Sequence, residues 1–321
     1  MSTALQRMKR RLRRSAKRAA ETLSGALAVG LLEGLRLVDP DRMANFAGRL
    51  MRRLGPLLSE HKLGRANLAA AFPEKSAAEI DAILMGVWEN LGRVGAEFAH
   101  LDRLWDYDAA HPERRGRIEL AASDIERFER LKADGKPALI FAAHLANWEL
   151  PAVCAATYDL DSAILYRRPN IAGIDRWLRR TRAASMGALI PTGLDAPVKI
   201  AAALGRGAHV GMLVDQYYVR GVEVMFFGRR TRANPLLARL AQHFDCPIHG
   251  VRAIRLPGNR FRAEITDAIA PARDAQGNLD IAGTMQVITG VVEDWIREYP
   301  EQWLWLHRRW RPEDETNATR P

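Results

Sequence analysis

Cysteine is scarce in this chain, and no apolar run is long. Cys154 and Cys246 are the only two cysteines among 321 residues, and both stand in apolar surroundings. Two such residues cannot make a disulfide framework, which suits a protein on the cytosolic side. No Cys/His spacing typical of a zinc site occurs in the sequence. Repeats, Gly/Ser linkers and low-complexity tracts are also absent, and apolar residues make up 48% of the chain, so a folded protein is expected.

Acidic residues are missing from the start of the chain. Residues 7–18 contain eight Lys or Arg and no acid, and the whole chain has a formal net charge of +10. Such a charge calls for an anionic partner, which can be nucleic acid, an acidic protein or a membrane surface. The apolar run that follows, residues 23–32, is shorter than the roughly 20 residues that span a bilayer.

A leucine repeat follows the basic segment. Leu23, Leu27, Leu31 and Leu35 recur at every fourth residue and would line one side of a helix. An apolar stripe beside a basic flank is typical of a helix that lies in the headgroup layer of an anionic membrane face. We therefore predict that residues 1–40 form a basic, amphipathic, membrane-associating helix. A core-packing helix with a solvated basic tail, or a single tilted span, remain alternatives.

The apolar spacing changes along the rest of the chain. It is helical at first, and then short apolar strands alternate with helices, which predicts an α/β fold with a mixed sheet flanked by helices. Late in the chain, residues 248–256 and 260–266 flank Pro-Gly-Asn and predict an antiparallel hairpin. We expect a single domain at 41–312, with a helical part at 41–120, an α/β part at 121–312 and a disordered tail at 313–321.

A histidine follows one of these strands directly. Residues 138–143 are apolar throughout, as in a central parallel strand. Pro151 fits only the first turn of a helix, so a helix must begin close to Glu149. His144 is therefore expected in the strand-to-helix turn, at the carboxyl end of a strand, where open α/β sheets place their chemistry. Across this turn the imidazole can meet the carboxylate of Glu149, which it could not do along one helix.

The pair of His144 and Glu149 suggests general-base catalysis. A neutral imidazole can take a proton from a hydroxyl, and a carboxylate on the other ring nitrogen fixes the tautomer and stabilises the imidazolium. No serine or cysteine stands in the turn, so the attacking hydroxyl would belong to a substrate, as in direct acyl transfer. The competing interpretation is a capping or core histidine beside an incidental glutamate.

Four blocks of sequence surround or follow this pair. They are His144-Leu-Ala-Asn-Trp-Glu149, Leu165-Tyr-Arg-Arg-Pro-Asn170, Val214-Asp-Gln216 with Phe226-Phe-Gly228, and Trp303-Leu-Trp-Leu-His-Arg-Arg309. In this order they resemble the late lipid A biosynthesis acyltransferases, which are bacterial inner-membrane enzymes of the lysophospholipid-acyltransferase type. The resemblance runs from about residue 44 to 311. The family usually writes its second block as Tyr-Arg-Pro, and Pro169 favours Arg168 over Arg167 as the matching arginine.

The resemblance implies a glycerolipid acyltransferase-like fold and a reaction. A fatty acyl chain would pass from an acyl-carrier-protein thioester to a hydroxyl of a lipid A precursor, at the cytoplasmic face of the inner membrane. The residues present require no metal or organic cofactor for this reaction. Arg167 and Arg168 would bind the phosphorylated acceptor, since a guanidinium fork holds phosphate through two hydrogen bonds; a surface salt bridge is the alternative.

Asp215 and Gln216 end a second buried strand, residues 208–214. Strand order would aim both side chains into the same cleft as His144, where they could hydrogen-bond sugar hydroxyls or orient Arg168. A helix N-cap is the alternative role for Asp215.

Two other classes of function are open to the sequence. A metal-dependent hydrolase could use His144, Glu149, His209 and Asp215 as ligands. A nucleic-acid-binding protein would explain the sequence pI of about 10.0, but the basic residues are not interleaved with a known binding module. We therefore expect the partners to be the carrier protein, the lipid A precursor and a membrane surface, and not nucleic acid.

Overall fold

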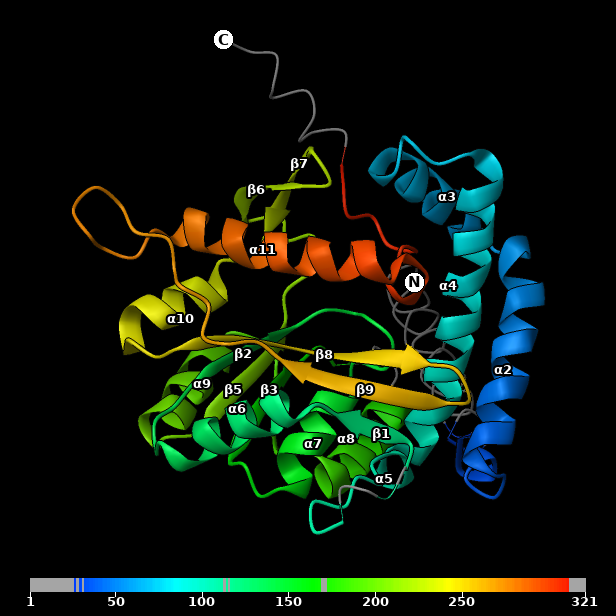
Figure 1. Cartoon of the computed structure of the whole chain (residues 1–321), viewed down its shortest axis with the longest axis horizontal. Coiled ribbons are helices and arrows are strands. Elements are labelled where there is room, and N and C mark those ends of the chain that lie inside the picture. Colours follow the sequence, from blue (N-terminus) through cyan, green and yellow to red (C-terminus); the bar gives the residue numbers. More distant parts are fainter. Residues whose placement is uncertain are drawn as a thin grey trace, which may run out of the picture.

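The computed structural model describes residues 26, 29–30, 32–111, 114, 116–168 and 172–311. Seven strands form one sheet in the order β1-β9-β8-β2-β5-β3-β4, with helices on both faces (Figure 1). These strands are β1 (Ile118–Leu120), β2 (Leu139–Ala142), β3 (Ser162–Tyr166), β4 (Ala188–Pro191), β5 (His209–Leu213), β8 (Ile248–Leu256) and β9 (Arg260–Ile265). A separate antiparallel pair joins β6 (Val222–Phe226) to β7 (Arg229–Ala233).

The sheet is parallel through its centre and antiparallel near one edge. β8, β2, β5, β3 and β4 pair in parallel, whereas β9 runs antiparallel to β8 and β1 runs parallel to β9. The predicted mixed sheet flanked by helices is therefore confirmed, as is the hairpin predicted at 248–256 and 260–266. β1 is a difference from the prediction, because this edge strand lies inside the stretch expected to be helical.

Residues 32–35 are helical, and ten further helices follow them in the described part of the chain. They are α2 (Pro40–Leu54), α3 (Glu60–Ala71), α4 (Ala77–Glu97), α5 (Leu101–Leu104), α6 (Ala122–Ala133), α7 (Leu150–Thr157), α8 (Ala172–Ser185), α9 (Ala196–Gly205), α10 (Leu236–Phe244) and α11 (Ile281–Glu298). Short 3₁₀ segments are η1 (Gly55–Leu57), η2 (Phe98–His100) and η3 (Pro300–Gln302). In Figure 1, α2, α3 and α4 stand together at one edge of the molecule.

The helix α4 shows how local sequence sets these boundaries. Ser76 and Glu79 form a capping box at its start, in which each side chain accepts from the backbone N–H of the other residue. Its contact with α2 is very close at Gly92, where an added Cβ would lie 2.4 Å from the carbonyl oxygen of Ala47. Glycine is therefore required at Gly92 for α2 and α4 to pack together.

The two faces of the central strands differ in burial. Leu139 and Phe141 on β2 are fully buried in the main hydrophobic core, which also contains residues of α9, α10 and α11. Ile140 and Ala142, on the opposite face of the same strand, remain partly exposed. A parallel sheet is normally covered on both faces, so the accessible face marks a hollow beneath α7.

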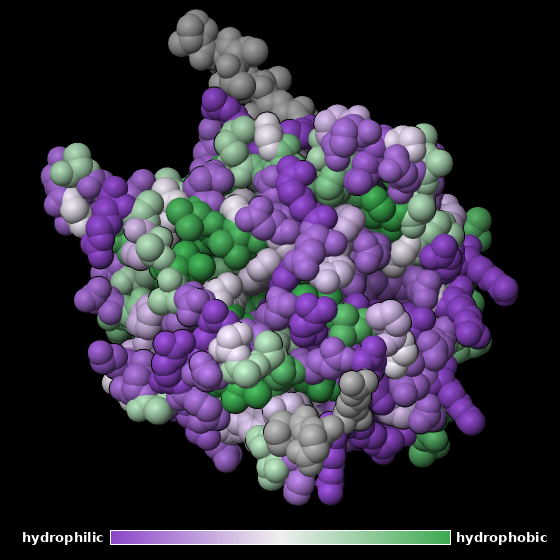
Figure 2. Space-filling view, in the orientation of Figure 1, coloured by the Kyte–Doolittle hydropathy of each residue, from purple (hydrophilic) through white to green (hydrophobic). Residues whose placement is uncertain are grey.

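Hydrophilic residues cover most of the surface shown in Figure 2, and apolar residues gather there in a few patches, one of them over the first half of α11.

The predicted extension at 1–40 and the predicted tail at 313–321 lie largely or wholly outside the described residues. Leu23, Leu27 and Leu31 of the predicted apolar stripe are among those not described. None of the described helices combines the length and the apolar character that crossing a bilayer requires.

Candidate active site

His144 and Asp215 meet at the carboxyl ends of two neighbouring strands. His144 follows β2 and Asp215 follows β5, which pairs with β2 in the sheet. Nδ1 of His144 lies 2.8 Å from Oδ1 of Asp215, and the backbone N–H of His144 donates to Oδ2 at 2.9 Å. The indole N–H of Trp303 donates to the same Oδ2 at 2.7 Å. The buried carboxylate is thus held by three donors, which fixes the position of the imidazole.

This geometry determines the tautomer of His144. The carboxylate of Asp215 can only accept, so Nδ1 carries the proton and Nε2 presents a lone pair. The amide nitrogen of Gln216 lies 3.4 Å from Nε2, and the ring of Trp148 packs edge-on against the imidazole at 5.1 Å between centroids. The His144 side chain keeps 15% of its surface exposed, so a substrate hydroxyl can reach Nε2.

The charges around His144 favour its protonated form. Burial alone would lower the pKa of His144, but the charge and hydrogen bond of Asp215, with a further contribution from the charge of Glu149, raise this pKa above its ordinary value. For Asp215 burial acts in the opposite direction, but the charge and hydrogen bond of His144 outweigh it and hold the pKa of Asp215 well below its usual range. The pair therefore stabilises an imidazolium at His144 against an ionised Asp215.

Glu149 does not occupy the position that the sequence predicted. Its carboxylate accepts two hydrogen bonds from the guanidinium of Arg182 on α8, from Nη2 to Oε1 at 2.5 Å and from Nε to Oε2 at 3.0 Å. Within the described residues no hydrogen bond joins His144 to Glu149, and the carboxylate on the imidazole is that of Asp215. The expected contact between His144 and Glu149 was therefore wrong. Strand pairing brings Asp215 to the imidazole, and the guanidinium of Arg182 on α8 binds Glu149 instead. The catalytic role of either residue stays a prediction.

Residues 302–304 hold the turn that carries His144 in place. Ala146 has a positive φ of 44°, which an L residue adopts only when its surroundings hold it. Its N–H donates to the carbonyl of Gln302 at 2.9 Å, and the carbonyl of His144 accepts from Leu304 N–H at 3.2 Å. An antiparallel bridge pairs Leu145 with Trp303. Residues 302–304 thus fix both the backbone of the turn and, through Trp303, the carboxylate of Asp215.

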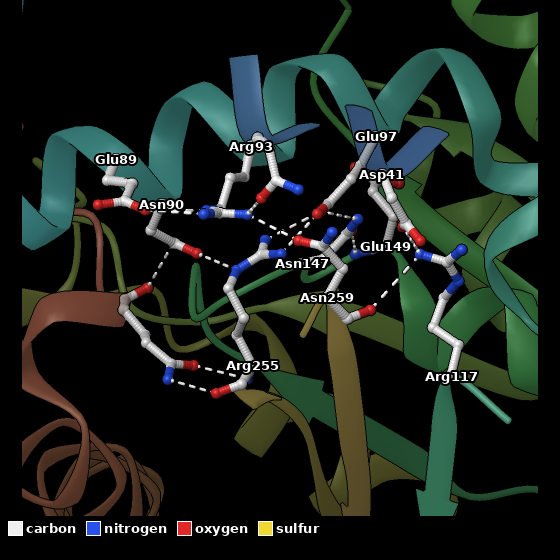
Figure 3. Close-up of polar contacts among 12 residues, drawn as sticks. Asp41, Glu89, Asn90, Arg93, Glu97, Arg117, Asn147, Glu149, Arg255 and Asn259 are labelled. Carbon is white, nitrogen blue, oxygen red and sulfur yellow. Dashed lines mark hydrogen bonds and ion pairs between the residues drawn. The ribbon is translucent and has the colours of Figure 1, made fainter. Parts of the chain in front are cut away.

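A buried polar network supports the same turn from the side of α4 (Figure 3). Glu97, which is 2% exposed, accepts from Asn147 at 2.9 Å and pairs through both oxygens with the guanidinium of Arg255, at 2.5 and 2.9 Å. Arg255 also donates to Asn90 at 2.9 Å. The side-chain oxygen of Asn147 accepts the N–H of Glu149 at 3.2 Å. The network therefore couples the helical part of the chain to the motif around His144.

Glu97→Gln is expected to destabilise the fold by about 3–5 kcal/mol, because it leaves the guanidinium of Arg255 buried without its charge partner. Urea denaturation followed by circular dichroism would measure the free energy of unfolding. Asp81→Asn is the matched control, since Asp81 forms an ion pair with Arg65 in which both side chains are about half exposed (52% and 45%), and it should change little. Equal, small effects of both substitutions would contradict a stabilising role for the network.

A large cavity opens beside His144 on the face of the sheet covered by α7. Its volume is about 610 Å³. Small residues leave this space open, among them Ala142, Gly211, Ala152 and Ala155. The rest of the wall is largely apolar and includes Phe128, Leu131, Ile140, Pro151, Leu160, Ile164, Val251 and Ile265. Polar side chains also line it, at the His144 end and at the amino end of the strands, where His209 and Ser162 lie. A mostly apolar wall with a small number of polar groups is typical of a site for an apolar ligand.

Comparison with known protein families agrees with this arrangement. A family model described as bacterial lipid A biosynthesis acyltransferase matches residues 13–312. The chain belongs to this family. The resemblance inferred from the four sequence blocks is thereby confirmed, and the chain is a member of an acyltransferase family. A search of curated proteins finds no match.

The other residues that the acyltransferase resemblance singled out lie at or near the same opening. Arg167 and Gln216 line the cavity together with His144, Tyr166 and Arg182. Arg167 and Arg168 both directly follow β3 and are exposed, so both are accessible to a ligand at this rim of the sheet. Pro169, which favoured Arg168 as the matching arginine, lies outside the described residues. Asp215 caps no helix, since β6 is the next element after it.

The four ligands of a metal-dependent hydrolase do not come together. His209 begins β5 and Asp215 follows its end, so the two are separated by about 20 Å along the strand at roughly 3.3 Å per residue. Nδ1 of His209 donates to the carbonyl oxygen of Asp161 at 3.3 Å, at the amino end of the sheet. Across the described ranges, no group of three or more His, Cys, Asp or Glu side chains is arranged to hold a metal ion.

Sequence reasoning missed Arg182 as part of the site. It lies 33 positions after Glu149 on a helix rich in arginine, and no fixed spacing links it to a motif. Glu97 and Asn147 were also missed as a contacting pair. The sequence offered one indication of this pair, which is that Glu97 stands on the apolar face at the end of a predicted helix. A carboxylate in such a position needs a polar partner.

Proposed function

We propose that this protein transfers a fatty acyl chain from an acyl-carrier-protein thioester to a hydroxyl of a lipid A precursor. The observation that carries the proposal is the hydrogen-bonded pair of His144 and Asp215 at the opening of a largely apolar cavity. Membership of the lipid A acyltransferase family supports the acceptor class. In this proposal Asp215 takes the orienting role that the sequence had suggested for Glu149.

The proposed reaction proceeds by direct transfer. Nε2 of His144 takes the proton of the acceptor hydroxyl while its oxygen forms a bond to the thioester carbonyl carbon, and the carbonyl electron pair moves onto oxygen. When the C=O bond re-forms, the C–S bond breaks and the leaving thiolate takes the proton from the imidazolium of His144. Asp215 keeps the ring in the productive tautomer and stabilises its charge between these steps.

The cavity under α7 is proposed to hold the acyl chain. It borders successive residues on one face of the central strands, from Ala142 and His144 at the carboxyl end to His209 and Ser162 at the amino end. Gly211 lies midway along β5 on this face, where the absence of a side chain keeps the cavity open. An added Cβ at Gly211 would meet only the end of the Ile164 side chain, at 2.9 Å.

Gly211→Leu is therefore expected to shorten the acyl chain that the enzyme transfers, because the new side chain would occupy the middle of the cavity. Competition between acyl donors of different length, with products separated by mass spectrometry, would show the shift. Val210→Ile is the matched control, since Val210 is on the same strand, is fully buried and belongs to the main core on the opposite face, outside the cavity lining. A Gly211→Leu enzyme with unchanged chain preference would show that the acyl chain lies elsewhere.

The other proposed contacts follow from charge. Arg167 and Arg168 would bind the phosphates of the acceptor, and Gln216 its hydroxyls or the imidazole. The net charge of +10 suits an acidic carrier protein and the anionic lipids of the cytoplasmic face of the inner membrane. We propose that the basic segment within residues 1–40 attaches the enzyme there as a peripheral helix or a single anchor.

Mass spectrometry of lipid A from cells with and without this protein tests the proposed function. Loss of one acyl chain from the lipid A of cells lacking the protein is the expected result, and it would also give the chain length and acceptor position. Unchanged lipid A in those cells, together with no transfer by the purified protein from acyl-carrier-protein to a lipid A precursor, would overturn the proposal.

A further inference from the structure

Arg182 is a cation in the cavity wall to which no role has been assigned. It lies on α8, lines the same cavity as His144 and is only 13% exposed in its side chain. Its Nε and Nη2 bind the two oxygens of Glu149, whose side chain is 6% exposed. A fork of two parallel hydrogen bonds fixes the plane of a guanidinium as well as its position.

Aromatic rings hold the guanidinium further. The central carbon of Arg182 lies 5.3 Å from the ring centre of Phe98 and 5.5 Å from that of Tyr166. Phe98 begins η2 after α4, and Tyr166 ends β3, so three separate elements immobilise this side chain. Nη1 takes part in neither bond to Glu149, and no hydrogen bond of Nη1 occurs within the described residues. A rigid donor thus remains available at the wall of the cavity.

The pairing with Glu149 decides which anion suits this donor. The ion pair is neutral overall, so it would attract a phosphate dianion weakly, and the exposed Arg167 and Arg168 serve that purpose better. A fixed N–H donor in a largely apolar cavity instead favours negative charge that develops only during reaction. Backbone donors are few in the nearby turn, since the N–H groups of His144, Leu145, Ala146 and Glu149 are already engaged.

We infer that Arg182 stabilises the oxyanion that forms on the acyl carbonyl, and that Glu149 acts on the reaction by positioning Arg182. The inference rests on the proposed acyl transfer and assigns the oxyanion donor of that reaction. The carbonyl oxygen gains the electron pair of the C=O bond and accepts a hydrogen bond from the guanidinium. It returns the pair when the C–S bond breaks, so Arg182 keeps its protons throughout.

Steady-state kinetics of Arg182→Gln, Arg182→Lys and Glu149→Gln on the full-length protein test this inference. Arg182→Gln should lower kcat by about 10²–10³-fold while the KM for acceptor changes little, because the lost interaction exists only in the transition state. Arg182→Lys should lose less, since it keeps a cation without the fork. Adding Glu149→Gln to Arg182→Gln should cost little more, because the two residues act as one unit.

Arg93→Gln is the matched control. Arg93 of α4 is likewise a mostly buried arginine in an ion pair, with Glu89, at 2.8 Å and 17% side-chain exposure, but it does not line the cavity. It should lower thermal stability to a similar degree and leave kcat unchanged. Thermal unfolding of every variant separates loss of fold from loss of catalysis, and Arg182→Lys keeps the test usable if Arg182→Gln does not fold.

Two results would overturn the inference. The first is a kcat that stays at the wild-type level in folded Arg182→Gln or Arg182→Lys. The second is a rise in acceptor KM alone that disappears with a dephosphorylated acceptor, which would make Arg182 a phosphate ligand. A wild-type protein that transfers no acyl chain would instead overturn the proposed function. If the wild type is active, His144→Ala is inactive and Arg182→Gln is fully active, then only this inference is overturned.

Discussion

Asp215→Asn is expected to lower kcat for acyl transfer by up to about 10⁴-fold, the size of the effect when the aspartate of a Ser-His-Asp triad becomes asparagine. The amide can present an N–H toward Nδ1 of His144, which favours the tautomer with its proton on Nε2. That tautomer has no lone pair where the acceptor hydroxyl must bind. The backbone N–H of His144 and the indole of Trp303, both bound to Oδ2, keep the side chain in place, so the fold should survive.

Single-turnover transfer with saturating carrier-protein thioester would measure this loss. Asp195→Asn is a suitable control, because Asp195 is an exposed carboxylate paired with Lys199 at 2.6 Å and does not line the cavity. If folded Asp215→Asn retained most of its activity while Glu149→Gln lost as much as expected here for Asp215, then Glu149 would be the carboxylate that serves His144.

His144→Ala should reduce kcat by about 10²–10⁴-fold, which is the contribution typical of a general base. The acceptor hydroxyl would then have to lose its proton to water in a largely apolar cavity. The same assay measures the effect, and thermal unfolding checks the fold, since the substitution also leaves buried Asp215 with fewer donors.

His243→Ala is the control for His144→Ala, because His243 is an exposed histidine on α10. It should leave transfer unchanged. A folded His144→Ala protein with wild-type kcat would remove the imidazole from the mechanism, whatever the geometry around it.

Much of the fold could be predicted because the central strands are short, mainly apolar runs bounded by glycine, proline or charge. β2 and β5 lie within one residue of the limits predicted for them, 138–143 and 208–214. The pair β6–β7 was missed, since β7 alternates Arg229, Arg230 and Arg232 with buried Thr231 and Ala233. A strand with one buried face and several arginines looks like a solvated basic cluster when only the sequence is read.

The place of His144 at the end of a central strand was predicted, but its hydrogen-bond partner was not. Local spacing drew attention to Glu149, the carboxylate nearest to His144 in sequence. Asp215 lies 71 positions from His144, and it reaches the imidazole only because β5 pairs with β2. Strand order is a long-range property that periodicity does not contain, so the sequence could place Asp215 in the same cleft without identifying its partner. The ion pair between Arg182 and Glu149 could not be predicted from the sequence for the same reason.

The pH dependence of kcat/KM, compared between the wild type, Asp215→Asn and Glu149→Gln, tests the central claim most directly. His144 must be neutral to accept a proton, so the rate should fall as the pH drops through its pKa. Since the charge and hydrogen bond of Asp215 raise that pKa above the ordinary value of about 6.5, the wild-type acid limb should lie above this pH. It should move to lower pH in Asp215→Asn and move less in Glu149→Gln. An acid limb at the same pH in wild type and Asp215→Asn would contradict the account.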